Sequence, residues 1–159
     1  MRVERMFNAQ TGEEERAPKM GVTIVAGPPG SGKSTLVRER MRSGDLVVDM
    51  DLLFTALSGG LDAREASRDL MPFVASARDA VLQRVLRPRQ SDKVTACWIV
   101  SAWPDPDALD LTARRLGAHV EVLRVESAEC KRRLRKDARP RLQELERAVD
   151  EWWNAWHAH

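Results

Sequence analysis

The 159-residue sequence has little of the material on which several protein classes depend. It holds two cysteines, Cys97 and Cys130, which are too few for a disulfide framework and are typical of a reducing compartment. No apolar run approaches the length of a membrane span, and the N-terminal segment lacks the apolar core of a signal peptide. We therefore expect a cytoplasmic protein without a membrane partner and without a structural zinc site.

An excess of charge of one sign is also lacking, because 26 Lys and Arg residues stand against 24 Asp and Glu residues. The resulting net charge of +2 allows a nucleic-acid partner but does not require one, and it says nothing of oligomeric state. Hydrophobic residues make up 43% of the chain, enough for the core of one domain. We expect residues 1–20 to form a mobile tail, or alternatively a short extra strand, before a single domain over residues 21–159.

Short apolar runs alternate with helical patterns along this domain. We expect strands at residues 21–26, 46–48, 94–100 and 120–125, and helices from residue 33, over 52–57, 72–88, 106–117 and 131–136, and from residue 141. In the helix over 72–88, Phe73, Ala77, Val81 and Val85 are expected to form one buried face. The alternation predicts a three-layer α/β/α domain with a parallel sheet of four or five strands.

Residues 27–34 read Gly-Pro-Pro-Gly-Ser-Gly-Lys-Ser and match the pattern G-x-x-x-x-G-K-[ST] between a predicted strand and a predicted helix. Glycines let successive backbone N–H groups point inward at phosphate oxygens, and the start of the helix adds its positive end. Lys33 would place its charge on the β- and γ-phosphates, and Ser34 would offer a hydroxyl to Mg²⁺. The residues expected to hold the nucleotide are Gly27, Pro28, Pro29, Gly30, Ser31, Gly32, Lys33, Ser34 and Thr35.

The rest of the chain narrows the class of nucleotide-binding protein. A switch GTPase needs an Asn-Lys-x-Asp motif, which this sequence lacks. A AAA+ motor needs an acidic pair after a core strand and a helical lid domain, whereas the third predicted strand ends in Trp-Ile-Val-Ser-Ala-Trp over residues 98–103. A small kinase that uses ATP and Mg²⁺ fits the size and the pattern best.

Two aspartates follow the second predicted strand in the segment Asp49-Met50-Asp51. Ligands collect at the carboxyl ends of the strands in such a sheet, where the phosphate loop also lies. Because side chains alternate along a strand, we expect Asp49 and Asp51 to point the same way. One carboxylate, for which we choose Asp49, would orient Mg²⁺ through water. The other, Asp51, would accept the proton of the acceptor hydroxyl or hold that hydroxyl in line. Asp51 also suits the N-cap of a helix that starts at Leu52, and the two roles are compatible.

A basic stretch over residues 128–141 follows the fourth predicted strand. One interpretation is a lid, in which Arg133 and Arg139 close over the γ-phosphate and stabilise the charge of the transition state. The alternative is a solvated basic helix face, which is the ordinary role of such a charge run. We favour the lid, because the chain offers no better source of an arginine for phosphoryl transfer.

The sequence indicates the residues that would bind the acceptor less clearly. Arg64, Arg68 and Arg78 lie between the second and third strands, and each is alternatively an exposed helical charge. Arg78 is the preferred acceptor-binding candidate among them. Trp103, beside Pro104, is the better candidate for stacking on an acceptor ring, whereas Trp98 and the cluster Trp152, Trp153 and Trp156 fit core packing.

The phosphate loop, the Asp49/Asp51 pair, and Cys130-x-x-Arg133 followed by Arg139-Pro140 resemble small P-loop kinases of the shikimate/gluconate type. They are similar also to the polynucleotide-kinase-like group, including short AAA-type ATP-binding proteins often encoded by phages. The resemblance covers residues 21 to about 141. It implies an Asp-x-Asp site for Mg²⁺ and acceptor, a lid, and adenine contacts around Arg133 and Arg139. The sequence departs from it in lacking a shikimate- or gluconate-recognition pattern and a carboxylate after the third strand.

The sequence therefore predicts a P-loop kinase that transfers the γ-phosphate of ATP to a hydroxyl of a small molecule, a nucleoside or nucleotide, or DNA. The missing carboxylate favours an alternative, an ATP-binding regulatory or packaging module that hydrolyses slowly and has no small acceptor.

Overall fold

The computed structural model describes residues 6–7, 14–15, 20–89 and 91–158. Strand β1 (Met6–Phe7) pairs antiparallel with β2 (Glu14–Glu15), and this pair is separate from the main sheet. The other residues of the predicted mobile tail over 1–20, apart from Met20, lie outside the described residues. The expected alternative of a short strand before residue 21 thus corresponds to two short strands that form a sheet of their own.

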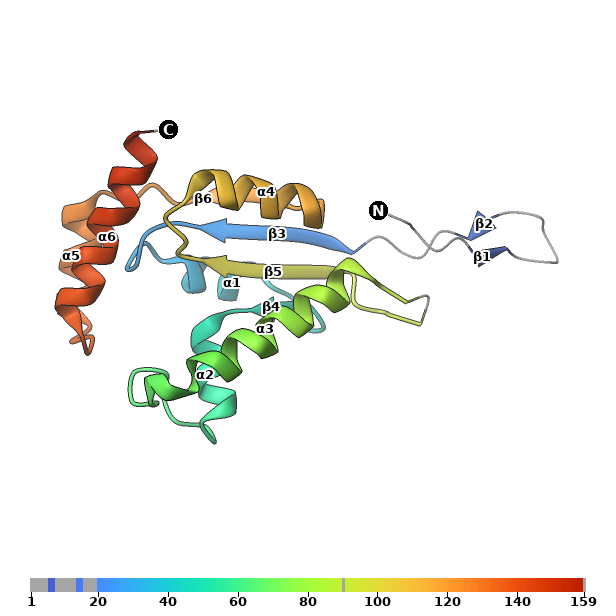
Figure 1. Ribbon diagram of the computed structural model, residues 1–159, viewed down its shortest axis with the longest axis horizontal. Helices are drawn as coiled ribbons and strands as arrows, with labels where there is room; N and C mark the ends of the chain where they lie inside the picture. The colour runs from blue at the N-terminus through green and yellow to red at the C-terminus, as the bar shows by residue number, and fades with distance from the viewer. Residues whose placement is uncertain (1–5, 8–13, 16–19, 90, 159) are drawn as a thin grey trace.

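The main sheet has four parallel strands in the order β4-β5-β3-β6 (Figure 1). They are β3 (Gly21–Ala26), β4 (Leu46–Val48), β5 (Ala96–Ser101) and β6 (His119–Val122). Each parallel connection needs a crossover segment, which the intervening helices supply. The predicted parallel α/β sheet is confirmed, and the strand that leads into the phosphate loop, β3, lies in its interior.

Helices cover both faces of this sheet. They are α1 (Lys33–Arg40), α2 (Met50–Leu57), the short 3₁₀ helix η1 (Arg68–Leu70), α3 (Met71–Leu86), α4 (Pro106–Leu116), α5 (Ser127–Lys136) and α6 (Leu142–His157). Val85 of α3 and Leu109 of α4 pack with Ile24 of the sheet in the main core. Val25 points to the opposite face of the sheet, because side chains alternate along a strand. Val25 and Val37 of α1 are both buried, and neither belongs to the main core. The three-layer prediction is therefore confirmed.

The expected buried face of the helix over 72–88 is wrong at its first position. Phe73 is 68% exposed, whereas the neighbouring Val74 is fully buried. The reason is that the first turn of α3 packs on α2 through Val74 and Phe54 rather than on the sheet. Farther along α3 the expectation holds at Val85, which joins the main core.

Helices α5 and α6 lie side by side beyond the carboxyl ends of the sheet strands (Figure 1). Cys130 and Leu134 of α5 pack against Val149 of α6. Trp152 is fully buried and stacks on Trp156 with 4.8 Å between ring centroids, so the expected packing role of the tryptophan cluster is confirmed there. Among the described helices, none has the length and apolar character of a membrane-spanning segment. The α5–α6 pair thus forms a layer beside the end of the sheet where the phosphate loop emerges.

Candidate nucleotide site

The phosphate loop connects β3 to α1 and is built on left-handed backbone at two glycines. Gly30 has φ 78° and Gly32 has φ 93°, a region that glycine adopts without the strain a side chain would add. Gly32 is also the N-cap residue of α1 and has no side chain with which to cap it. The backbone N–H groups at the start of α1 are therefore available to an anion, as a phosphate cradle requires.

Close contact with α5 is a second reason for glycine in this loop. A Cβ atom at Gly30 would lie 2.8 Å from the carbonyl oxygen of Cys130 and 3.1 Å from Cγ of Leu134. At Gly27, a Cβ atom would lie 2.9 Å from the carbonyl oxygen of Leu123. The loop is thus held between the segment that follows β6 and the helix predicted as the lid.

Lys33 is buried, with 8% of its surface exposed, and folds back over its own loop. Its Nζ donates a 2.7 Å hydrogen bond to the carbonyl oxygen of Pro28 and a 3.4 Å hydrogen bond to Oγ of Ser31. Burial lowers the pKa of Lys33 to about 8, although the nearby Cys130, Asp49 and Asp51 act in the opposite direction. A phosphate placed in the loop would supply the negative charge that this ammonium group needs.

Asp49 joins the phosphate loop to the end of β4. The hydroxyl of Ser34 donates a 2.7 Å hydrogen bond to one carboxylate oxygen of Asp49, which is 6% exposed. The other carboxylate oxygen accepts a 2.9 Å hydrogen bond from the backbone N–H of Asp51. Asp49, and not Asp51, is therefore the N-cap of α2, and the prediction of a cap at Asp51 is wrong because the helix begins two residues earlier.

Asp51 lies in the first turn of α2, and its side chain is 64% exposed. Strand alternation, from which we expected Asp49 and Asp51 to point the same way, does not apply because β4 ends at Val48, but both residues line the same cleft. Partial withdrawal from water and the neighbouring carboxylate of Asp49 raise the pKa of Asp51, while the guanidinium of Arg139 lowers it. One Nη of Arg139 lies 3.9 Å from a carboxylate oxygen of Asp51.

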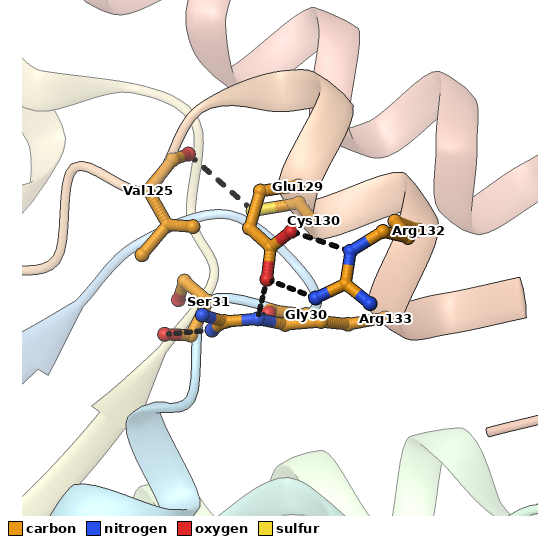
Figure 2. A network of polar contacts seen from close by, with 7 residues as sticks. All are labelled: Gly30, Ser31, Val125, Glu129, Cys130, Arg132 and Arg133. Carbon is orange, nitrogen blue, oxygen red and sulfur yellow. Dashed lines mark hydrogen bonds and ion pairs between the residues drawn. The ribbon is translucent and has the colours of Figure 1, made fainter. Parts of the chain in front are cut away.

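The basic stretch over 128–141 brings Arg133 to the phosphate loop, as Figure 2 shows. Its Nη1 lies 3.5 Å from the carbonyl oxygen of Gly30 and 3.4 Å from that of Ser31. Its Nε donates a 2.6 Å hydrogen bond to Glu129, which also accepts two hydrogen bonds from Arg132. These bonds from Arg132 and Arg133 lower the pKa of Glu129 to about 2. Glu129 therefore stays ionised and holds Arg133 against the loop.

A cleft of about 650 Å³ collects these groups. Residues of the loop, both aspartates and both predicted lid arginines line it: Pro29, Gly30, Gly32, Lys33, Ser34, Thr35, Asp49, Asp51, Arg133 and Arg139. The sequence analysis missed Glu129, Arg132, Lys136 and Asp137, which also line the cleft. The spacing of Glu129 with Arg132 and Arg133, at three and four residues on one helix, was the available signal.

Arg78 and Trp103 are not brought to this cleft. They line a second cavity of about 350 Å³ between α3, β5 and α4, which shares Met50 and Val100 with the nucleotide cleft. Arg78 is paired with the adjacent Asp79 at 2.8 Å, and Trp103 is 52% exposed. The structure thus places these two acceptor candidates together, but apart from Asp51.

The oxygen atoms of Ser34 and Asp49 fit a Mg²⁺ ion that also binds phosphate. Mg²⁺ prefers oxygen ligands and takes few of them from the protein, keeping waters and substrate phosphates for the rest. Among the described residues no group of three or more His, Cys, Asp and Glu side chains forms a metal site. A hydroxyl and a carboxylate beside a phosphate cradle match this requirement.

Comparisons with known proteins agree with this geometry. A family model described as an AAA domain matches residues 22–159. The thymidylate kinase of Mycoplasmoides gallisepticum (strain R(low / passage 15 / clone 2)) is 28% identical over an alignment of 101 residues. The match covers 54% of this chain and 48% of that protein. The chain thus spans about half the length of this curated relative.

Among solved structures, a chain of the Pnkp1/Rnl/Hen1 RNA repair complex superposes with a TM-score of 0.63 at 18% identity. The match covers 88% of this chain and 46% of that chain. At this level of identity, the likeness shows a common fold.

Proposed function

The chain belongs to the AAA-domain family whose model matches residues 22–159, and on that premise we propose that it is an ATP-dependent kinase with a hydroxyl-bearing acceptor. One observation carries this proposal: a single cleft contains the phosphate loop, Asp49 and Asp51, and the arginines of the lid. Phosphoryl transfer depends mainly on positioning and on charge stabilisation, and these are the groups that supply both.

The loop and its neighbours would hold the nucleotide. The N–H groups at the start of α1 bind phosphate oxygens, and Lys33 exchanges its bond to the carbonyl of Pro28 for the β- and γ-phosphates. Ser34 and Asp49 would hold Mg²⁺, which when bound neutralises charge on the phosphates. The hydrogen bond from Ser34 to Asp49 supports this proposal, because it holds the two oxygen ligands next to each other.

Asp51 and Arg139 would act on the transferred phosphoryl group. The exposed carboxylate of Asp51 accepts the proton of the acceptor hydroxyl as its oxygen approaches the γ-phosphorus. Arg139, which lies at the same edge of the cleft, stabilises the negative charge that spreads over the γ-oxygens, and Arg133 supports the loop from the other side.

The absence of a carboxylate after β5 favours a second candidate, a regulatory or packaging module that binds ATP and hydrolyses it slowly. Val100 and Ala102 line the cleft where an acidic residue would assist the metal. In this candidate the cleft holds nucleotide and Asp51 has no acceptor to deprotonate.

Transfer of label from γ-labelled ATP separates the two candidates. With Mg²⁺ and pools of nucleosides, nucleotides, sugars and 5′-hydroxyl DNA, the kinase labels an acceptor. Asp51→Asn should lower that rate by about 10²-fold or more, the usual size of a general-base contribution. Asp110→Asn, an equal change of charge on the exposed face of α4, should leave the rate unchanged. Release of free phosphate alone, at equal rates in all three proteins, would contradict the kinase.

A further inference from the structure

An apolar cavity lies between α3 and α4, beside the nucleotide cleft. Its volume is about 350 Å³, and Ile24 and Ile99 of the sheet form its floor. In Figure 1 the two helices run at an angle to each other across the sheet, and the cavity occupies the space between them. We call it the α3–α4 cavity. Its volume lies in the range of small-molecule sites in proteins.

The walls of the α3–α4 cavity are mainly hydrophobic. Leu82 and Leu86 of α3 line one side, and Leu109 and Leu116 of α4 line the other. Trp103, which follows β5, is exposed and lines the same cavity. An aromatic side chain beside aliphatic walls favours a flat ring as the ligand, because the indole can pack on the face or the edge of that ring.

The charged groups of the α3–α4 cavity favour an acidic substituent on this ring. Two arginines, Arg78 and Arg115, stand against one carboxylate, Asp79. Arg78 is paired with Asp79 at 2.8 Å, whereas the guanidinium of Arg115 makes no ion pair or hydrogen bond with the described part of the chain. The neighbouring Arg114 is paired with Asp110 at 2.7 Å. Arg115 is therefore the cation of this cavity that is free to bind an anionic group.

The α3–α4 cavity is separate from the proposed transfer site. Among the described residues, Met50 and Val100 are the ones that line both this cavity and the nucleotide cleft. Lys33, Asp51 and Arg139 line the cleft and are not part of the wall of the cavity. A ring held in the cavity would thus leave the phosphate loop open, so that the ring and a nucleotide can be bound at the same time.

Met50 connects the α3–α4 cavity to the aspartates of the nucleotide cleft. It is the first residue of α2 and stands between Asp49 and Asp51 in the chain. It also packs with Phe54 and Val74, through which α2 contacts α3. Because packed side chains transmit displacement, an occupant that contacts Met50 would hold the first turn of α2 in one position. A ligand of this cavity thus has the position of an effector.

We propose that the α3–α4 cavity binds a flat, mainly apolar organic anion, with its ring against Trp103 and the leucines and its acidic group at Arg115. The occupant binds while the nucleotide cleft is filled. This inference goes beyond the proposed function and does not depend on it, because binding in the cavity requires no phosphoryl transfer.

Two fluorescent naphthalene probes test the ring and the charge separately. Anilinonaphthalene sulfonate carries an anionic group, and phenylnaphthylamine has the same rings without it. Arg115→Ala should weaken binding of the sulfonate probe about tenfold, the value of one charge-assisted hydrogen bond, and leave the affinity for the neutral probe unchanged. Arg114→Ala removes the adjacent charge and should alter neither affinity. Equal affinities for the sulfonate probe in the wild type and in Arg115→Ala would overturn the inference.

Two further measurements locate the probes. Thr112→Phe places a ring in the cavity and should weaken both probes about tenfold, because it covers the surface that they would cover. Leu111→Phe is the matched control on the exposed face of the same helix. Arg115→Ala, a surface change, keeps the test valid if Thr112→Phe does not fold. Saturating Mg·ADP should leave both probes bound, and their complete displacement by Mg·ADP would place them in the nucleotide cleft and overturn the inference.

Discussion

The hydroxyl of Ser34 lies 2.7 Å from a carboxylate oxygen of Asp49, and this bond joins the first turn of α1 to the end of β4. The second oxygen of the same carboxylate caps α2 through the N–H of Asp51. One buried side chain therefore sets the distance between the phosphate loop and the helix that carries Asp51. Because Asp49 accepts a hydrogen bond from Ser34 with one oxygen and caps α2 with the other, the effect of its charge and its capping function can be tested separately.

Asp49→Asn should separate the two functions of that residue. Asparagine is as good an N-cap as aspartate, so the unfolding temperature should change little. Loss of the negative charge should raise the Mg²⁺ concentration needed for half-maximal activity about tenfold, the usual effect of losing a supporting group at a metal. Asp105→Asn makes the same change at the N-cap of α4 and should leave the Mg²⁺ dependence unaltered. An unaltered Mg²⁺ dependence in Asp49→Asn would exclude a role at the metal.

Gly30→Ala should disturb the contact between the phosphate loop and α5. The new Cβ would lie 2.8 Å from the carbonyl oxygen of Cys130, so the helix or the loop must shift. Gly44→Ala has a similar positive φ, 95°, but nothing within 4 Å of the new Cβ. Both variants carry the backbone strain of about 1 kcal/mol, whereas only Gly30→Ala should also lose affinity for ATP. Thermal unfolding and nucleotide titration measure the two effects, and equal ATP affinities would contradict the packing argument.

Nucleotide binding should be accompanied by proton uptake at mildly alkaline pH. Burial lowers the pKa of Lys33 to about 8, so near pH 8.5 the free protein holds this amine largely neutral, whereas bound phosphates favour the ammonium. Titration of ATP in two buffers of different ionisation enthalpy should show uptake of part of a proton near pH 8.5 and almost none near pH 6.5. Equal proton uptake at both pH values would show that a group other than Lys33 takes up the proton.

The lowered pKa of Lys33 also predicts how the stability of the free protein depends on pH. Between about pH 8 and the ordinary value for lysine, the unfolded chain holds a proton on Lys33 that the folded chain has lost. The contribution of this residue to the free energy of unfolding therefore rises with pH through that window. Lys33→Met should remove this part of the pH dependence, as measured by chemical unfolding at several pH values, and Lys93→Met should not. An unchanged pH dependence in Lys33→Met would contradict a buried amine of lowered pKa.

Asp51→Asn should leave the fold intact, or slightly more stable, at neutral pH while it lowers the rate of transfer by about 10²-fold or more. The pKa of Asp51 is raised in the folded protein, so folding favours the protonated carboxyl. The free energy of unfolding that this carboxyl contributes is present below its ordinary pKa and is lost as the pH rises through its raised pKa in the folded protein. At neutral pH the ionised carboxylate therefore lowers the stability of the fold. Any increase in the unfolding temperature of Asp51→Asn over that of the wild type should be seen at pH 7 and not in acid. A variant less stable than the wild type at pH 7 would contradict this assignment.

The parts of the site that follow from local patterns were predictable from the sequence. The loop over residues 27–34 has a fixed spacing, and the strands before and after it are short β-branched runs, so the sheet and the start of α1 were predicted closely. The prediction failed where two neighbouring residues were equally suited to one role. Asp49 and Asp51 are both good N-caps, and only the end of β4 at Val48 decides that Asp49 takes the position.

The small cavity lined by Asp51, Arg68, Arg139 and Arg141 could not have been predicted, because three separate segments form it. Arg68 is the first residue of η1, Arg139 and Arg141 lie between α5 and α6, and Asp51 lies in the first turn of α2. In the sequence, each of these arginines is indistinguishable from a solvated surface charge. Only the packing of the α5–α6 pair beside α2 brings them together. Phe73 shows the converse, since helical spacing places it on a buried face that packing against α2 turns outward.

The central claim is that the loop from Gly27 to Ser34 binds the terminal phosphates of a nucleotide. Calorimetric titration with Mg·ATP tests it most directly, in the wild-type protein, in Lys33→Met, and in Lys93→Met as a control of equal charge on an exposed residue. We predict one binding site in the wild type and in Lys93→Met, and no measurable heat in Lys33→Met. No heat in the wild type, or equal heats in all three proteins, would contradict the account.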